Sequence, residues 1–238
     1  MKTITQIYDK MLDDNYTGLD KWVHHLVIFE DYLTKLKPKN SLTKFNLVNI
    51  SESVDSSILF HNYVSQWNLE EFQIIHVHEN PKDVSELKKL GIKTMQGSAE
   101  DESFLRKVAS AAGSFDVLVD DTHYTNKQRT IVKFLYPRMA DNGVLFVEDT
   151  YLGLRKEYVT SKPSFLEYVQ TLYRELDDWH NNAMQDKQYQ LPDQRRDIAE
   201  YRQLTQFAKN TKCIHLYNGL VVLERLSIEP PYQKVRHW

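Results

Sequence analysis

Four carboxylates and one histidine stand directly after two short apolar runs of the chain. They are Asp120, Asp121, His123, Glu148 and Asp149. Carboxylate oxygens are the ligands that hard divalent cations such as Mg²⁺ and Ca²⁺ prefer. A cation that holds a hydroxyl group lowers the pKa of that group, and a neutral imidazole beside it can accept the proton. These residue types therefore indicate metal-assisted proton transfer. The alternative is that the carboxylates have no catalytic role and are solvated turn residues or helix caps.

The two apolar runs belong to a unit that would bring these side chains together. Residues 115–119 and 144–147 have the length of strands, and residues 126–139 between them carry apolar side chains at helical spacing. A turn signal at Asn142-Gly143 ends that helix. A strand–helix–strand unit of this length joins parallel neighbours, whose C-terminal ends lie at the same edge of the sheet. Open α/β sheets bind ligands at that edge, so we expect the five side chains to gather there.

The length and charge of the chain narrow the class of protein. The chain has 238 residues and a net charge of −3, with an isoelectric point near 6.3. Its length suits one α/β domain with additions. It lacks the basic excess typical of nucleic-acid binding, so we expect no nucleic-acid partner.

Targeting signals and cysteine content indicate the compartment. No run approaches the roughly 20 apolar residues of a membrane span, and the start of the chain has no signal-peptide pattern. Cys213 is the only cysteine, which excludes an internal disulfide and suits a reducing compartment. We therefore expect a cytoplasmic protein with no membrane partner.

Strand and helix patterns alternate along the first part of the chain. Residues 1–40 are predicted to form an amphipathic helical extension that covers part of the sheet. After it we expect strands at 45–50, 72–78 and 92–95, with helices at 55–67, 81–90 and 102–112. This alternation predicts a doubly wound parallel sheet.

After position 151 the pattern changes. We expect an amphipathic helix at 164–179, a polar loop at 180–196 and a further helix at 198–209. These elements form an inserted segment at about 151–209. Two apolar runs around Asn218-Gly219 then predict a β-hairpin.

Four segments of the chain resemble the motifs of one enzyme family. They are DKWVHH at 20–25, DDTH at 120–123, NGVLFVED at 142–149 and KNTKCIHLY at 209–217. In this order they are similar to the TDK…H, DDGSH, GGxxxxED and KSIHFY motifs of the metal-dependent sugar O-methyltransferases of the mycinamicin and macrocin type. That family is a class I group that uses S-adenosylmethionine. The resemblance implies a Rossmann-like methyltransferase domain at 41–238, with a mostly parallel seven-stranded sheet that ends in an antiparallel hairpin.

The resemblance also implies roles for the acidic residues. In the family, the acidic ends of two strands hold a divalent metal, and the histidine beside the first acts as general base. Carried over, Asp121, Glu148 and Asp149 hold Mg²⁺ or a similar cation, and His123 is the base. Because the DDTH segment is one residue shorter than the family motif, either Asp120 or Asp121 corresponds to the family's ligand.

The cofactor half of the site departs from the family pattern. The residues at the family's cofactor positions are Lys21, Ser51, His78, Glu79, Ser98 and Asp120. The glycine-rich turn ExGxxxGxS is replaced by NISESVDSS at 49–57, so side chains stand where the family needs close backbone approach. Within this turn, Ser53 or Asp55 has an alternative role as a helix N-cap. Either His78 or Glu79 replaces the acid that holds the ribose, and Ser98 replaces the acid near the adenine.

Other polar and aromatic residues have two interpretations. Lys21 and His25 lie near the cofactor if the resemblance holds, and on the exposed surface of a helix if it does not. Tyr151 and Trp179-His180 suit an acceptor pocket because aromatic rings pack against sugars, with burial in the core as the alternative.

Two functions follow from these observations. The first is transfer of a methyl group from S-adenosylmethionine to a sugar hydroxyl of a natural product or polysaccharide precursor, so the substrate is a small molecule that contains a sugar. The second is a degenerate methyltransferase-like protein that has lost cofactor binding and serves as a binding or assembly module, or performs other metal-dependent sugar chemistry. The N-terminal helices also suggest self-association as a homo-oligomer.

Overall fold

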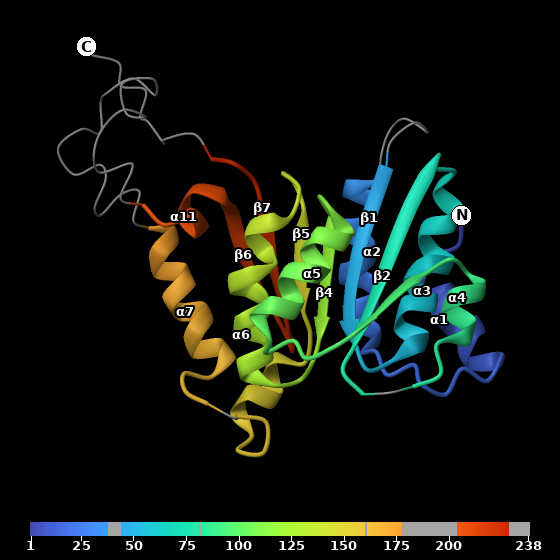
Figure 1. Ribbon diagram of the computed structural model, residues 1–238, viewed down its shortest axis with the longest axis horizontal. Coiled ribbons are helices and arrows are strands. Elements are labelled where there is room, and N and C mark those ends of the chain that lie inside the picture. Colours follow the sequence, from blue (N-terminus) through green and yellow to red (C-terminus); the bar gives the residue numbers. More distant parts are fainter. Residues whose placement is uncertain (38–43, 81, 160, 178–203, 229–238) are drawn as a thin grey trace, which may run out of the picture.

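A mixed sheet of seven strands lies between two layers of helices in the computed structural model (Figure 1). The structure describes residues 1–37, 44–80, 82–159, 161–177 and 204–228. The strands are β1 (Lys44–Ser51), β2 (Glu71–His78), β3 (Lys93–Gln96), β4 (Val117–Asp121), β5 (Val144–Val147), β6 (Thr211–Tyr217) and β7 (Leu220–Arg225). Their spatial order is β3-β2-β1-β4-β5-β7-β6.

The first five strands are parallel, and the last two are not. β1 pairs in parallel with both β2 and β4, β2 with β3, and β4 with β5. β7 runs antiparallel to β5, and β6 runs antiparallel to β7 at the edge. The predicted methyltransferase-type sheet with a C-terminal hairpin is therefore confirmed, and Gly219 in the hairpin turn has a φ of +75° that suits glycine.

One helical layer contains the N-terminal part of the chain. It is made of α1 (Ile4–Asp13), α2 (Val23–Leu36), α3 (Val54–Val64), continued by the 3-10 turn η1 (Ser65–Trp67), and α4 (Ser85–Lys89). α1 begins at Thr3, which forms a capping box with Gln6. The ring of Phe29 in α2 packs edge-on against Phe146 of β5, with centroids 4.7 Å apart. Burying a side chain of this size stabilises the fold by about 1.5–3 kcal/mol, so the N-terminal layer is joined to the central sheet.

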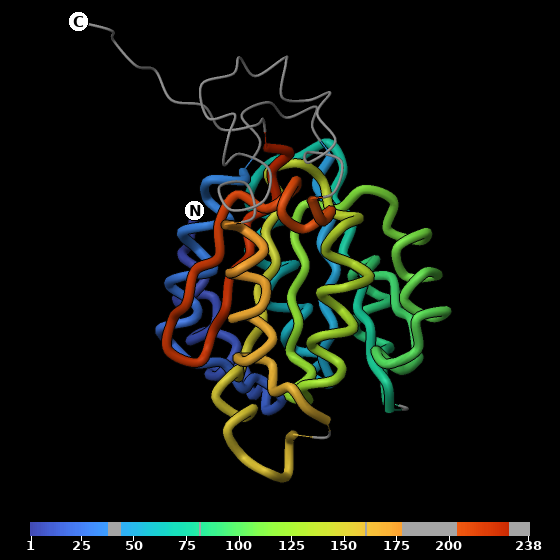
Figure 2. The backbone as a smooth tube through the Cα atoms, turned by 90° about the vertical axis from the view of Figure 1, so that its left-hand side faces the viewer, coloured from blue at the N-terminus to red at the C-terminus, as the bar shows by residue number. Residues whose placement is uncertain are grey.

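The other helical layer covers the opposite face of the sheet. It contains α5 (Glu102–Ala112), α6 (Thr125–Phe134) and α7 (Phe165–Leu176). Figure 2 shows the sheet between the blue N-terminal helices and the green helices of this layer. The short helix α11 (Gln206–Asn210) leads into β6.

The predicted elements agree with the structure except at their ends. The predicted N-terminal extension is two helices, with residues 14–22 between them. The predicted helix at 126–139 ends at Phe134 and continues as the 3-10 turn η2 (Tyr136–Arg138), because Pro137 cannot donate a backbone hydrogen bond within a helix. The 3-10 turn η3 (Thr150–Leu154) follows the second acidic pair.

Some predictions fall on residues outside the described part of the chain. The loop at 180–196 and the pair Trp179-His180 lie there, and α11 covers only the end of the predicted helix at 198–209. The domain boundaries near positions 40, 151 and 209 remain predictions. Among the described residues, no helix combines the length and the apolar character needed to cross a membrane.

A small polar layer is buried between the sheet and α3. Asn49 of β1 donates from Nδ2 to the hydroxyls of Ser56 (3.2 Å) and Ser57 (2.9 Å). The Ser57 hydroxyl also lies 2.9 Å from Nδ1 of His76, whose side chain is fully buried. Burial lowers the pKa of His76 to about 3, so the imidazole is neutral in the folded protein.

His76 is expected to make the protein less stable as the pH falls from about 6.5 to about 3. In this window the unfolded chain binds a proton at His76 and the folded chain does not, which costs up to about 1.4 kcal/mol per pH unit. Denaturant unfolding of wild type and His76→Gln at several pH values measures this effect. The stability advantage of wild type over the variant should shrink steadily as the pH falls, and an advantage that does not change with pH would contradict the assignment.

Candidate functional site

The pleat of the sheet divides the four predicted carboxylates between its two faces. Successive residues of a strand point to opposite faces. Asp121 at the end of β4 therefore points toward the N-terminal helices together with Glu148, which follows β5. Asp120 points to the other face, where it is fully buried, and its Oδ1 accepts hydrogen bonds from the amide and hydroxyl groups of Thr122. The residues gather at one edge as predicted, but their side chains do not form one cluster.

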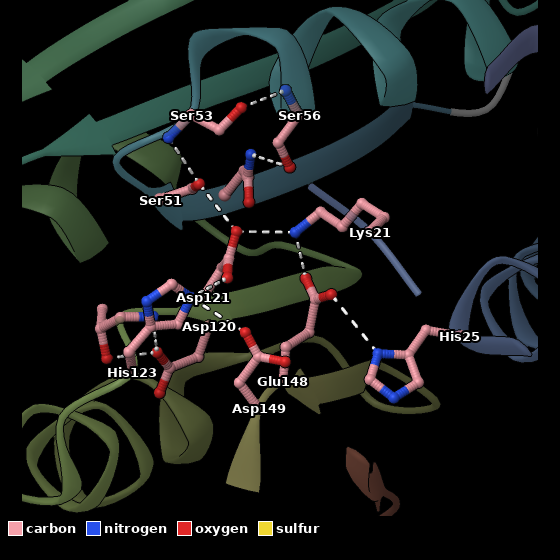
Figure 3. Close-up of polar contacts among 12 residues, drawn as sticks. Lys21, His25, Ser51, Ser53, Ser56, Asp120, Asp121, His123, Glu148 and Asp149 are labelled. Atoms are coloured by element: carbon pink, nitrogen blue, oxygen red, sulfur yellow. Dashed lines mark hydrogen bonds and ion pairs between the residues drawn. The ribbon is translucent and has the colours of Figure 1, made fainter. Parts of the chain in front are cut away.

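A buried lysine joins the two carboxylates that face the N-terminal helices. Lys21 Nζ lies 2.7 Å from Asp121 Oδ2 and 2.5 Å from Glu148 Oε1 (Figure 3). Burial lowers the pKa of Lys21, but the attraction of the two carboxylates outweighs it and leaves that pKa above its ordinary value. The lysine side chain is only 1% exposed. The alternative in which Lys21 lies on an exposed helix surface is therefore wrong.

Two neighbours complete this buried network. The Ser51 hydroxyl donates to Asp121 Oδ2 at 2.9 Å. His25 is also fully buried, with Nδ1 3.7 Å from Glu148 Oε2 and Nε2 2.9 Å from the carbonyl oxygen of Asn218. His25 therefore connects the acidic strand end to the turn of the C-terminal hairpin.

His123 lies between two carboxylates on the outer side of the network. Its Nε2 is 2.9 Å from Asp121 Oδ1 and 3.0 Å from Asp149 Oδ2. Hydrogen bonds to Asp121 and Asp149 raise the pKa of His123 to about 10. Both His123 (φ +66°) and Asp149 (φ +53°) have left-handed backbone conformations, which residues other than glycine seldom adopt.

The ligand atoms of Asp121, His123 and Asp149 lie within 4.8 Å of one another. The two carboxylate oxygens suit a hard divalent cation, and the imidazole nitrogen beside them is placed to act either as a further ligand or as a base. The carboxylate of Glu148 is directed instead at Lys21 and His25. The metal-ligand role of Glu148 remains a prediction.

A cleft of about 460 Å³ lies beside this group, at the C-terminal ends of the parallel strands. It is lined by residues 50–53, 77–80 and 121–124, by Gly18 and Asp20 from the segment between α1 and α2, and by Gly97, Ala99 and Lys127. The volume falls within the usual range for small-molecule and cofactor sites. The cleft lies outside the carboxyl ends of β1 and β4, where the order of the strands reverses and such sheets bind ligands.

The turn without glycine lines the cleft and leaves it open. Ser53 caps α3 by accepting a hydrogen bond from the amide of Ser56, which confirms its alternative role as N-cap. All residues from 49 to 57 are described, and none of them has a positive φ. The turn therefore folds without the glycines of the family motif.

A glycine from another part of the chain contacts this turn. The amide of Gly18 donates to Asp55 Oδ2 at 2.8 Å, and the Ser53 hydroxyl donates to the carbonyl oxygen of Gly18 at 2.5 Å. A Cβ atom on Gly18 would lie 2.8 Å from Asp55 Oδ2, so a larger residue would push the two segments apart. The sequence did not point to Gly18, which lies more than 30 positions from the turn.

Three of the six predicted cofactor residues line the cleft. These are Ser51, His78 and Glu79, whereas Lys21, Ser98 and Asp120 are not among the residues that line it. The amide of Glu79 donates to Glu52 Oε1 at 2.7 Å, and its carboxylate pairs with Lys127. Sequence reasoning missed Lys127, because a lysine on a helix surface carries no signal that it pairs across a cleft.

A second pocket of about 310 Å³ lies beside the turn of the C-terminal hairpin. It is lined by Trp22, His24, Tyr151, Asn218 and Gly219. The rings of Trp22 and Tyr151 meet edge to face with centroids 6.3 Å apart. Trp22 is about half exposed, at 52%. This pocket contains Tyr151, which the sequence suggested for an acceptor pocket.

Curated proteins similar to this chain are methyltransferases that act on sugars. No family model matches the chain. Over 138 residues it is 29% identical to the 8-demethyl-8-(2-methoxy-alpha-L-rhamnosyl)-tetracenomycin-C 3'-O-methyltransferase of Streptomyces olivaceus, covering 56% of this chain and 32% of that protein. Over 70 residues it is 34% identical to the mycinamicin VI 2''-O-methyltransferase of Micromonospora griseorubida, covering 29% of this chain and 18% of that protein. The resemblance inferred from the motifs is confirmed, and the matches span about a third or less of these relatives' own length.

Solved structures of similar fold include the MycE methyltransferase from the mycinamycin biosynthetic pathway. Its complex with Mg and SAH has a TM-score of 0.71 and 15% sequence identity, covering 95% of this chain and 55% of that chain. Its complex with Mg, SAH and mycinamycin VI has a TM-score of 0.70 and 14% identity, covering 95% of this chain and 54% of that chain. The predicted fold is confirmed, and this chain spans about half the length of MycE.

Replacing Lys21 should destabilise the protein strongly. Lys21→Met leaves Asp121 and Glu148 buried without their cation, and loss of one member of such a group costs about 3–5 kcal/mol. Lys44→Met is the matched control, because the Lys44–Glu71 pair is 72% and 58% exposed and solvent screens the attraction between exposed charges. Denaturant unfolding at neutral pH compares the two, and equal stability of both variants would contradict the structural role of Lys21.

Proposed function

We propose that this chain forms the catalytic part of a metal-dependent enzyme that transfers a methyl group from S-adenosylmethionine to a sugar hydroxyl. The observation that carries this proposal is that the ligand atoms of Asp121, His123 and Asp149 lie together, with Asp121 and His123 in the wall of the cleft beside β1 and β4. The curated relatives are named as O-methyltransferases of sugar-bearing natural products. A glycosylated small molecule is therefore the proposed acceptor.

The donor set suits a Mg²⁺-type cation. Asp121 and Asp149 would hold the cation with hard carboxylate oxygens, and Glu148 stays a candidate ligand on the basis of the family pattern. A cation bound there would lower the pKa of an acceptor hydroxyl. A cation held by Asp121 and Asp149 would offset the two carboxylates that raise the pKa of His123, so its imidazole would be neutral. His123, which is 40% exposed and lines the cleft, is then the proposed base for the hydroxyl proton.

The cleft suits the cofactor through a changed set of contacts. Ser51 and the turn that follows it offer hydroxyl and amide groups on one wall, and His78 and Glu79 offer polar groups at the end of β2. The amide of Glu79 and the carboxylate of Glu52 fix the backbone there. Gly18 from the N-terminal segment also lines this wall, where its backbone is hydrogen-bonded to Asp55 and Ser53, so the wall is built without the family's glycine-rich turn.

The aromatic pocket beside His25 is the proposed acceptor side. Trp22 and Tyr151 present ring faces and edges of the kind that pack against the apolar faces of sugars. Tyr151 follows Asp149 by two residues in the chain, so the pocket and the predicted metal ligands share one short segment.

Calorimetry with the demethylated product, S-adenosylhomocysteine, tests the proposal directly. We expect binding by the full chain in the presence of Mg²⁺, and about tenfold or greater loss when Ser51→Leu places a bulky apolar group in the cleft. Thr205→Leu is the matched control, because Thr205 caps α11, donates to Glu175 and does not line the cleft. No binding by wild type at millimolar ligand, with and without Mg²⁺, would reject the proposal and favour the degenerate binding module.

A substitution of His123 separates its role as base from a role as metal ligand. His123→Ala should lower the methyl-transfer rate by about 10²–10⁴-fold, which is the usual contribution of a positioned base. It should leave Mg²⁺ affinity within about threefold of wild type, whereas Asp149→Asn should weaken Mg²⁺ binding by roughly tenfold or more. Mn²⁺ binding followed by electron paramagnetic resonance measures the second quantity. Unchanged turnover in His123→Ala would exclude the base, and lost cation binding would make His123 a ligand.

A further inference from the structure

A second group of metal-binding side chains lies on the C-terminal hairpin, away from the acidic strand ends. It consists of Cys213 and His215 on β6 and Glu224 on β7. Cys213 Sγ lies 2.9 Å from His215 Nε2, and that same nitrogen lies 3.0 Å from Glu224 Oε1. All three ligand atoms lie within 4.8 Å of one another.

The hairpin places these side chains together by its register. Cys213 and His215 are two residues apart on β6 and share one face, and Cys213 is directly opposite Glu224. A shift of register between Thr211 and Cys213 leaves Lys212 as the extra residue of a β-bulge. Bulges commonly redirect side chains, and here Lys212 Nζ reaches Glu224 Oε2 at 2.7 Å. One carboxylate oxygen is therefore held by the lysine while the other points at the histidine.

The imidazole of His215 is positioned by aromatic neighbours. The ring of Tyr32 in α2 lies 6.0 Å from it at a steep angle, and the ring of Tyr217 is stacked at 6.3 Å. The hydroxyl groups of these two tyrosines are 3.2 Å apart. His215 is nevertheless 40% exposed at its side chain, so a solvated cation has access to the group.

The geometry argues against a cysteine nucleophile. In a catalytic Cys–His–acid arrangement one ring nitrogen contacts the sulfur and the other contacts the carboxylate. Here His215 Nε2 contacts both Cys213 and Glu224, so the ring cannot take a proton from the thiol while the acid orients it.

We propose that Cys213, His215 and Glu224 form a binding site for Zn²⁺ or a cation of similar preference, separate from the predicted Mg²⁺ site. Zn²⁺ accepts this combination of sulfur, nitrogen and oxygen ligands, and three protein ligands leave a fourth position for water. Tetrahedral bond lengths place neighbouring ligand atoms about 3.3–3.6 Å apart. The observed contacts of 2.9 and 3.0 Å need to open only slightly to admit the ion.

Such an ion would link the edge strand β6 to its inner neighbour β7, because its ligands come from both strands. Among the described strands β6 pairs with β7 alone, and an edge strand depends on fewer backbone hydrogen bonds than a central one. Through Tyr32, the same site contacts α2, the helix that begins just after Lys21. Zn²⁺ would therefore stabilise the hairpin and the helix packed on it.

Cobalt binding by the full chain tests the site, because a thiolate ligand gives Co²⁺ a charge-transfer absorption that carboxylate ligands do not give. Metal-free wild type should bind one equivalent of Co²⁺ with this absorption, and Zn²⁺ should displace it. His215→Ala and Glu224→Gln should each weaken Co²⁺ binding at this site by at least about tenfold. His24→Ala and Asp149→Asn are the matched controls and should leave the absorption unchanged.

Thermal unfolding with and without Zn²⁺ is an independent test, which compares wild type with a cysteine variant and does not use Glu224→Gln. Zn²⁺ should raise the Tm of wild type and leave the Tm of Cys213→Ser unchanged, with circular dichroism confirming that both are folded. The proposal is overturned if wild type shows no thiolate absorption with Co²⁺. It is also overturned if His215→Ala and Glu224→Gln bind Co²⁺ as tightly as wild type, since the thiol alone would then explain the binding.

Discussion

The ammonium group of Lys21 lies in the protein interior between two carboxylates that are also buried. Each of these three charges would be costly to remove from water by itself, so each depends on the other two. Lys21 belongs to the segment between α1 and α2, which is anchored where Gly18 exchanges hydrogen bonds with the first turn of α3. The segment between the N-terminal helices is therefore part of the site, because it supplies the cation that lies between the carboxylates of Asp121 and Glu148.

The four acidic residues at the strand ends have different partners and therefore different roles. The carboxylate of Glu148 is committed to Lys21, whereas Asp121 uses one oxygen for Lys21 and the other for His123. Asp149 reaches His123 only because its backbone adopts a left-handed conformation just after β5. Burial in the other layer raises the pKa of Asp120 to about 7, and its carboxylate is hydrogen-bonded to Thr122. The two carboxylates that contact His123 are thus Asp121 and Asp149, one from each acidic strand end.

The two donor clusters of the described chain differ in chemical softness. The cluster at the cleft offers carboxylate oxygens with one imidazole, and the cluster on the hairpin offers a thiol, an imidazole and one carboxylate oxygen. Hard cations prefer the first kind and Zn²⁺ prefers the second. The C-terminal hairpin carries the second cluster, and its turn also contacts His25 beside Glu148 through the carbonyl oxygen of Asn218. The hairpin is consequently a structural link between the edge of the sheet and the site at the strand ends.

The sequence by itself determined the fold and the place of the site. Alternating strand and helix patterns, Asn218-Gly219 between two apolar runs, and acidic residues at two strand ends depend on local periodicity, which survives in a single sequence. Pro137 was a local signal for the early end of α6. The tertiary structure alone decided which face each carboxylate takes, that Lys21 is buried, and that Gly18 lies against a turn more than 30 positions away. It also brought Glu224 beside Cys213 and His215 through a bulge. These arrangements are contacts between segments that are distant in the sequence. Local sequence patterns do not predict such contacts, because the side chains meet only when the chain folds.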